Sequence, residues 1–171
     1  KAAALPVTET DVVAVDWFNG RRTPDANHTL KGAIAGLNLG TDAPKIFKAL
    51  VEATAFGAKR IVERFQSEGV PIRQVIGIGG VSKKSPFVMQ TLANVLNMPI
   101  KIVRSEQACA LGAAICAATA AGVYPTMPAA QAAMASAYDA EFHPQPGRVE
   151  VYGKLYRQYV ELGDFVENNR M

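Results

Sequence analysis

The stretch QVIGIGGVSKKSPFVMQTL, residues 74–92, decides how the rest of the chain is interpreted. Its apolar run VIGI predicts a short buried strand, which stops at two adjacent glycines, Gly79 and Gly80. A loop with two lysines follows, and Pro86 is expected to open a helix. Glycines at a strand end mean either that the backbone turns sharply there or that another group lies against it.

Helix and strand signals alternate on both sides of this stretch, which predicts an α/β domain with helices against a sheet. We expect strands in DVVAVDW (11–17), QVIGI (74–78) and IKIVRS (100–105). We expect helices at about 42–69, 86–96, 108–121 and 129–137, and a last one after the polar connection HPQPGRVE, with a packing stripe of Tyr152, Leu155, Tyr159, Leu162 and Phe165. The alanine-rich helix at 108–121 is expected to pack tightly on the sheet.

The first long helix carries the clearest periodicity. Thr41-Asp42 offers an N-cap and Pro44 suits the first turn. Lys48 with Glu52, and likewise Lys59 with Glu63, are spaced as i,i+4 pairs and are expected on the solvent side. The expected buried stripe is Ile46, Leu50, Thr54, Gly57, Ile61 and Phe65.

Composition excludes several classes of protein. The 171 residues are 49% hydrophobic and 19% charged, as in an ordinary globular domain, and no apolar run is long enough to span a membrane. A net charge of +3, without a basic block, argues against nucleic acid. The chain starts at Lys1 without a signal-peptide pattern, so we expect a piece of a longer protein.

Cysteine and histidine usage predicts a reducing, cytoplasmic setting. On a helix, Cys109 and Cys116 would lie about 10 Å apart along the axis, beyond the ~7 Å that a disulfide allows between Cα atoms. We expect both thiols to be buried as small hydrophobic groups. His28 and His143 have no partners at zinc-ligand spacing, so no metal ligand is assigned.

Three interpretations of Gly79-Gly80 remain open on local grounds. The glycines could simply turn the chain with a positive φ. A dinucleotide-binding fold fits less well, because Ser82 stands where the third glycine of G-x-G-x-x-G belongs, and no Walker A loop is present. In the third interpretation a nucleotide lies across the strand end, where glycine removes the Cβ that would collide with it.

The segment GIGGVSKKSPFVMQTLANVLNMPI (77–100) resembles the adenosine-binding segment of the glycerol kinase and xylulose kinase family of carbohydrate kinases. SEQACALGAAICAATAAGVY (105–124) resembles that family's following alanine-rich helix, and GLNLGTDAPKIFKALVEATAFGAKRIVE (36–63) resembles its preceding signature helix. DWFNGRRTPDAN, LKGAIAGLNL and YGKLYRQYVEL are most similar to the bacterial members that act on L-ribulose. The resemblance runs from about Val12 to Phe165.

This resemblance implies an actin-like, ribonuclease H-like ATPase domain, the C-terminal half of a two-domain sugar kinase, with an incomplete sheet. Residues 1–171 would form its nucleotide-binding domain, and the N-terminal sugar-binding domain would be its partner. The implied cofactors are ATP and Mg²⁺, and the implied substrate is a pentulose, L-ribulose, in L-arabinose breakdown; another pentulose such as xylulose stays open. The resemblance implies nucleotide contacts from Gly79, Gly80, Lys84 and Ser85.

The same resemblance implies that this chain carries no catalytic residue, because the family's catalytic base lies in the N-terminal domain; the chain alone is therefore expected to be inactive. Ala110 and Gly112 would let the alanine helix approach the nucleotide.

Asp16 is interpreted as a turn-forming carboxylate and Glu106 as a helix-terminal charge. For Arg21 and Arg22, phosphate or domain contact and simple solvation stay open. A non-catalytic module for oligomerisation or hinge closure is the alternative of another class.

Overall fold

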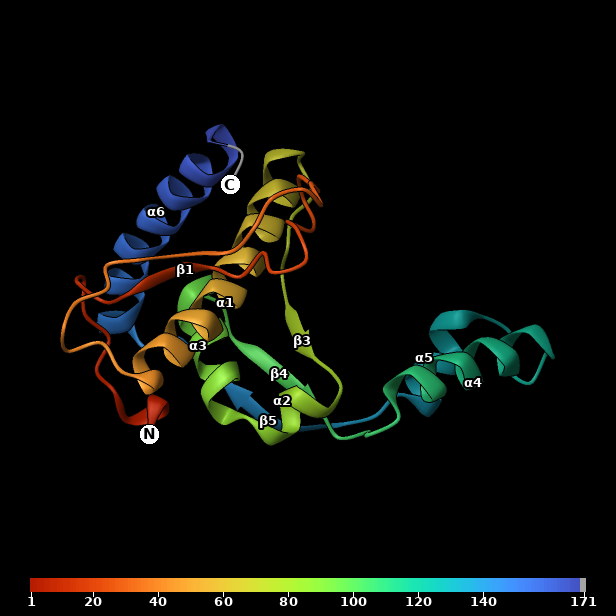
Figure 1. Cartoon of the computed structure of the whole chain (residues 1–171). Helices are drawn as coiled ribbons and strands as arrows, with labels where there is room; N and C mark the ends of the chain where they lie inside the picture. Colours follow the sequence, from red (N-terminus) through yellow and green to blue (C-terminus); the bar gives the residue numbers. More distant parts are fainter. Residues whose placement is uncertain (170–171) are drawn as a thin grey trace.

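The computed structural model describes residues 1–169 and divides them into two small sheets with helices around them (Figure 1). The predicted alternation of helices and strands is confirmed. In chain order the elements are the 3-10 turn η1 (Ala2–Ala4), β1 (Val13–Val15), β2 (Ala33–Ala35), α1 (Ala43–Ser67), β3 (Val75–Gly77), α2 (Gly80–Lys84), α3 (Pro86–Leu96), β4 (Ile100–Val103), α4 (Ala108–Ala120), α5 (Met127–Met134), β5 (Tyr138–Phe142) and α6 (Pro146–Asn168).

The larger sheet has the order β3-β4-β5, with β3 parallel to β4 and β5 antiparallel to it. In the described part of the chain no strand pairs with the outer edge of β3, which agrees with the expected incomplete sheet. Strand β5 was missed from the sequence. Its residues, YDAEF, lack the β-branched alternation of an ordinary strand, and most of them are exposed. Strands β1 and β2 form a separate antiparallel pair.

Helix α1 begins as predicted, but it buries a different face. The Asp42 carboxylate caps it by accepting a hydrogen bond from the Lys45 N–H at 3.1 Å, the usual role of an N-cap aspartate. The predicted stripe is wrong at Thr54 and Phe65, which are exposed, while its other four residues are half-buried. Of the two pairs predicted on the solvent side, Lys48 and Glu52 are instead buried, together with Ala49, Ala53, Ala55 and Phe56. In the second pair Lys59 is half-buried and Glu63 is exposed.

The packing of the main core explains why α1 buries a different face than predicted, because β1, α3 and α6 pack around the face centred on Phe56. The Phe56 ring lies 5.3 Å from the ring of Tyr159 and 6.2 Å from that of Tyr152, both on α6. The α6 stripe is largely confirmed, with Tyr152, Leu155 and Tyr159 fully buried. Phe165 is the exception, with 54% of its surface exposed.

A second core fills the space between α3 and the larger sheet. It consists of Met89 and Ala93 from α3 against Ile100 and Ile102 from β4. Gly77 in β3 is required by this packing, because a Cβ there would lie 2.7 Å from Ile102 Cδ1. The core holds β3 against β4 and α3 through Val75, and the glycine pair follows directly after this strand.

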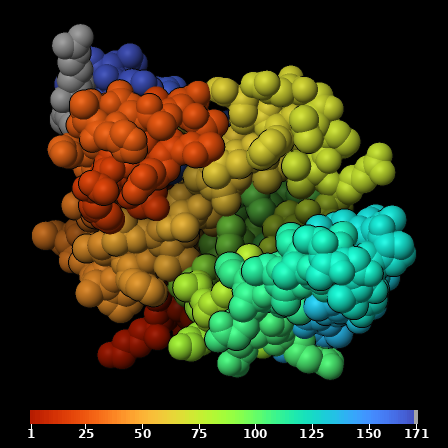
Figure 2. All heavy atoms as spheres, turned by 90° about the vertical axis from the view of Figure 1, so that its right-hand side faces the viewer, coloured from red at the N-terminus to blue at the C-terminus, as the bar shows by residue number. Residues whose placement is uncertain are grey.

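Helices α4 and α5 form a hairpin that projects away from the rest of the molecule (Figure 1), and Figure 2 views the molecule from that side. The expected packing of α4 on the sheet is therefore wrong, since α4 packs mainly against α5. Ile115 is its buried side chain, while Cys109 and Cys116 are free and exposed, contrary to the predicted burial. Among residues 1–169, no helix has the length and apolar character needed to cross a membrane.

Candidate functional site

The glycine pair forms the turn between β3 and α2. Gly79 has φ 82° and ψ 179°, a backbone conformation that is accessible almost only to glycine. Gly80 has ordinary dihedral angles and is the first residue of α2. The turn is closed by Ser82, whose hydroxyl donates a hydrogen bond to the Gly79 carbonyl at 2.7 Å. The simplest interpretation, a turn with positive φ, therefore accounts for Gly79 but not for Gly80.

The outer side of this turn faces open space. A Cβ built on Gly79 or on Gly80 would meet no other heavy atom within 4 Å. The flanking side chains are also exposed, Ile78 at 55% and Val81 at 61% of their surface. Nothing in the described chain requires position 80 to lack a side chain. The bare backbone is thus available to a group from outside the chain.

The two other predicted contact residues differ in their availability. Lys84 is exposed, and within residues 1–169 its ammonium makes no hydrogen bond or ion pair. Ser85 is the N-cap of α3, and its hydroxyl accepts a hydrogen bond from the Val88 N–H at 3.4 Å. Gln90 of α3 donates a hydrogen bond to the His143 carbonyl, just after β5. Lys84 is therefore the side chain beside the turn that is free to reach a ligand.

An open apolar hollow of about 340 Å³ adjoins the turn on the side of α1. Ile78, Val81 and Ser82 contribute to its wall, and so do the apolar side chains of α1 and α3 that face the outer edge of β3. Ala110 and Gly112 do not approach the turn as expected, because α4 lies in the projecting hairpin and a Cβ on Gly112 meets nothing within 4 Å. Alanine spacing predicts a helix but does not identify the surface on which it packs.

The loop after β1 holds the candidate acids and arginines. Asp16 accepts a hydrogen bond from the Thr54 hydroxyl of α1 at 3.1 Å, so it fastens the loop to a helix rather than forming a turn with its own side chain. Arg21 is neither solvated nor free for phosphate, since it is 8% exposed and makes two hydrogen bonds with Glu167, at 2.6 and 2.9 Å. Arg22 is exposed. Glu106 is exposed ahead of the α4 N-cap and lies outside the first turn of that helix.

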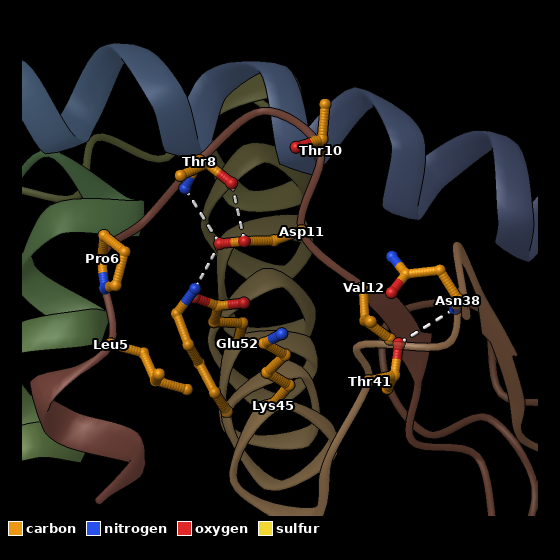
Figure 3. A pocket seen from close by; sticks show the side chains of 11 residues that line it. Leu5, Pro6, Thr8, Thr10, Asp11, Val12, Asn38, Thr41, Lys45 and Glu52 are labelled. Carbon is orange, nitrogen blue, oxygen red and sulfur yellow. Dashed lines mark hydrogen bonds and ion pairs between the residues drawn. The ribbon is translucent and has the colours of Figure 1, made fainter.

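A buried polar cluster that was not predicted from the sequence lies on α1, beside the N-terminal segment (Figure 3). The Lys48 ammonium contacts the carboxylates of Asp11 and Glu52, and the Tyr152 hydroxyl donates to Glu52 at 3.0 Å. Burial raises the pKa of Glu52 to about 6. Burial also acts to raise the pKa of Asp11, but hydrogen bonds from Lys48 and Thr8 outweigh it and lower that pKa.

This cluster forms the floor of a cavity of about 280 Å³ between α1 and the N-terminal segment. Its charged groups are paired with one another, so the arrangement is that of a structural ion cluster rather than a catalytic centre. The only hint in the sequence is that Lys48 and Glu52 are next to the small residues Ala49 and Ala53. In residues 1–169 no three His, Cys, Asp or Glu side chains come together in a way that could hold a metal ion.

Comparison with known proteins identifies the family of the chain. The FGGY family of carbohydrate kinases, C-terminal domain, matches residues 1–121. A ribulokinase of Vibrio parahaemolyticus is 54% identical over 155 residues, which is 91% of this chain but 27% of that protein. The chain thus spans less than a third of the length of this relative.

Solved structures of sugar kinases share the fold. A xylulose kinase of Rhodospirillum rubrum superposes with a TM-score of 0.82 at 25% identity, covering 99% of this chain and 33% of that one. A Plasmodium falciparum glycerol kinase solved with ADP matches with a TM-score of 0.75 at 24% identity, over 94% of this chain and 32% of that one. The fold is thus the actin-like ATPase fold of these kinases, and the chain belongs to the FGGY family of carbohydrate kinases.

Proposed function

We propose that residues 1–171 are the nucleotide-binding C-terminal domain of a longer kinase, which transfers a phosphoryl group from ATP to L-ribulose and forms L-ribulose 5-phosphate. Membership of the carbohydrate kinase family supports the reaction class. The identity of 54% to a ribulokinase supports L-ribulose as the acceptor, in the breakdown of L-arabinose in the cytoplasm. The observation that carries the proposal for this chain is the open backbone at Gly79 and Gly80.

In this proposal the chain contributes one wall of the nucleotide site. The glycine backbone would lie against the nucleotide, and the exposed Lys84 stem would cover it from the side. Ser85 is a weaker candidate than the sequence suggested, because its hydroxyl already caps α3. Mg²⁺ would neutralise charge on the phosphates, and the proton acceptor for the sugar hydroxyl would come from the N-terminal domain. No residue of this chain is assigned a catalytic or metal-binding role.

A nucleotide titration of the 171-residue chain tests the wall directly. With MgADP, we expect amide chemical-shift changes clustered at residues 78–85. Gly80→Leu should abolish them while the fold stays intact, because a Cβ there meets no other heavy atom within 4 Å. Gly112→Leu is the matched control, since this glycine is equally open but lies on α4. Shifts elsewhere, or shifts that Gly80→Leu leaves unchanged, would refute the assignment of the glycine turn.

A kinase assay tests the substrate. The intact protein should form ADP from ATP in the presence of L-ribulose, and more slowly with D-xylulose. The isolated chain should form none, because phosphoryl transfer needs groups on both sides of the substrate. Faster turnover with D-xylulose would favour a different pentulose. Absence of sugar-dependent ADP formation by the intact protein would favour a non-catalytic module instead.

A further inference from the structure

The adjacent lysines of the glycine turn point in different directions and make different contacts. Lys83 turns back toward the sheet, where its ammonium donates to the Arg104 carbonyl and lies 3.2 Å from an Asp139 carboxylate oxygen. Lys84 is exposed and makes no such contact among the described residues. The Lys83 side chain is 24% exposed. The two lysines are adjacent and chemically identical, but their surroundings therefore differ.

Asp139 joins three segments that are distant in sequence. One of its oxygens faces Lys83 of α2, and the other accepts a hydrogen bond from Arg104 Nε at 3.0 Å, just after β4. The Arg104 N–H in turn donates to the Ala137 carbonyl at 2.8 Å, just before β5. The hydrogen bonds from Arg104 and Lys83 lower the pKa of Asp139. The carboxylate therefore connects α2 to the two strand ends from which the α4–α5 hairpin projects.

The glycine turn has few other anchors. Gly79 and Gly80 have no side chains to pack, while Ile78 and Val81 are more than half exposed. Ser82 is buried, but its hydroxyl closes the turn on itself and, within residues 1–169, bonds to no other element. A five-residue helix is too short to be stable without tertiary contacts. The contacts of Lys83 are thus the polar bonds that hold this segment against the sheet.

We propose that Lys83, held by Asp139 and the Arg104 carbonyl, is a positioning residue that keeps the glycine turn in the conformation that receives the nucleotide. This inference rests on the proposed nucleotide site for its functional meaning. The two lysines then have separate roles: Lys83 orients the backbone from behind, and Lys84 faces the ligand.

Hydrogen exchange of the amides at residues 79–84, measured on the free 171-residue chain, tests the positioning without any ligand. Lys83→Met should speed exchange by about fivefold, the order of one ion pair near the surface. Lys84→Met removes the same charge one position later and should leave exchange unchanged. Asp139→Asn should reproduce part of the effect of Lys83→Met, and the double variant should exchange no faster than Lys83→Met.

The MgADP titration tests whether the position of the turn affects nucleotide affinity. Lys83→Met should weaken binding by about fivefold while the melting temperature stays near that of the Lys31→Met variant, a control for loss of an exposed charge. Unchanged exchange in Lys83→Met overturns the proposal, and so does faster exchange with unchanged affinity. If the wild-type chain binds no MgADP, the proposed nucleotide wall fails for this chain, while the exchange data still decide whether Lys83 holds the turn.

Discussion

Neighbouring glycines need not have the same function. Gly79 is required by its backbone, because φ 82° with ψ 179° strains any residue with a Cβ. Gly80 has ordinary dihedral angles, and its Cβ direction is empty. The absence of a side chain at position 80 therefore has no structural explanation within the described chain, which is why the ligand interpretation attaches to Gly80 first.

This difference predicts opposite outcomes for two matched substitutions. Gly79→Ala should lower the free energy of unfolding by about 1–3 kcal/mol, the cost of holding alanine in a glycine-only conformation. Gly80→Ala should leave the free energy of unfolding unchanged or raise it slightly. Position 80 is the first residue of α2, and alanine has a higher helix propensity than glycine. Urea unfolding of both variants against the wild type provides the measurement. Equal losses in the two variants would contradict the assignment of the strain to Gly79.

Glu52, which was expected on the solvent side, is buried, and burial raises its pKa toward neutral pH. Its pKa of about 6 in the folded protein exceeds the ordinary value of 4.5, so the folded state favours its protonated form. The stability that this group contributes is therefore complete below pH 4.5 and is lost as the pH rises through 6. Asp11 has a lowered pKa, so its contribution changes only at more acidic pH.

Glu52→Gln tests this sign. The free energy of unfolding of the wild type, minus that of the variant, should fall by about 2 kcal/mol between pH 4.5 and pH 7, since each pKa unit corresponds to about 1.4 kcal/mol. Glutamine keeps an acceptor for the Tyr152 hydroxyl but does not titrate. Chemical unfolding at several pH values measures the difference. A difference that rises with pH would show that Lys48 lowers the Glu52 pKa more than burial raises it.

At the scale of elements, the helix ends are where the sequence was most informative. Asp42 is confirmed as the N-cap of α1, where it accepts a hydrogen bond from the N–H of the third helical residue. Ser85 caps α3 in the same way, a role that was not predicted. These signals are local, because a cap bonds only to its own helix. Ser85 was also assigned to the nucleotide, and its two possible roles can be separated by substitution.

Ser85→Ala should lower the free energy of unfolding by about 1 kcal/mol through the loss of the cap. Ser85→Asp should restore most of it, since aspartate also caps helices. If Ser85 serves only α3, MgADP should bind Ser85→Ala as it binds the wild type. Chemical unfolding and the nucleotide titration together provide the readout. A large loss of affinity for MgADP in Ser85→Ala, without a matching loss of stability, would show that Ser85 contacts the nucleotide.

At the scale of the whole molecule, the outer edge of β3 is the most exposed apolar region beside the candidate site. Ile76 and Ile78 are 44% and 55% exposed, and the open hollow beside them is lined by apolar side chains of α1 and α3. The hairpin that projects from the same end of the sheet as the glycine turn carries no charged residue between Gln107 and Tyr138. Exposed strand edges and apolar patches of this kind promote association between proteins.

We therefore expect the isolated chain to self-associate as its concentration rises. The double variant Ile76→Lys, Ile78→Lys should weaken this association, because charge at an open strand edge opposes edge-to-edge pairing. Its melting temperature should change little, as both side chains are partly exposed. Sedimentation velocity over a range of concentrations measures the effect. Association that persists unchanged in the double variant would point to the α4–α5 hairpin as the contact surface instead.

The sequence by itself determined the features that depend on neighbours along the chain. The helix caps, the strand before the glycine pair and the order of the family motifs all follow from local chemistry and spacing. The tertiary structure alone decided which surfaces meet. Glu52 is buried beneath Tyr152 of α6, and Lys48 is buried against Asp11 of the N-terminal segment. Arg21 is buried because Glu167 lies beside it. β5 pairs with β4 and α4 stays exposed for the same reason: burial depends on the partner that folding brings near, and periodicity describes only one side of that contact.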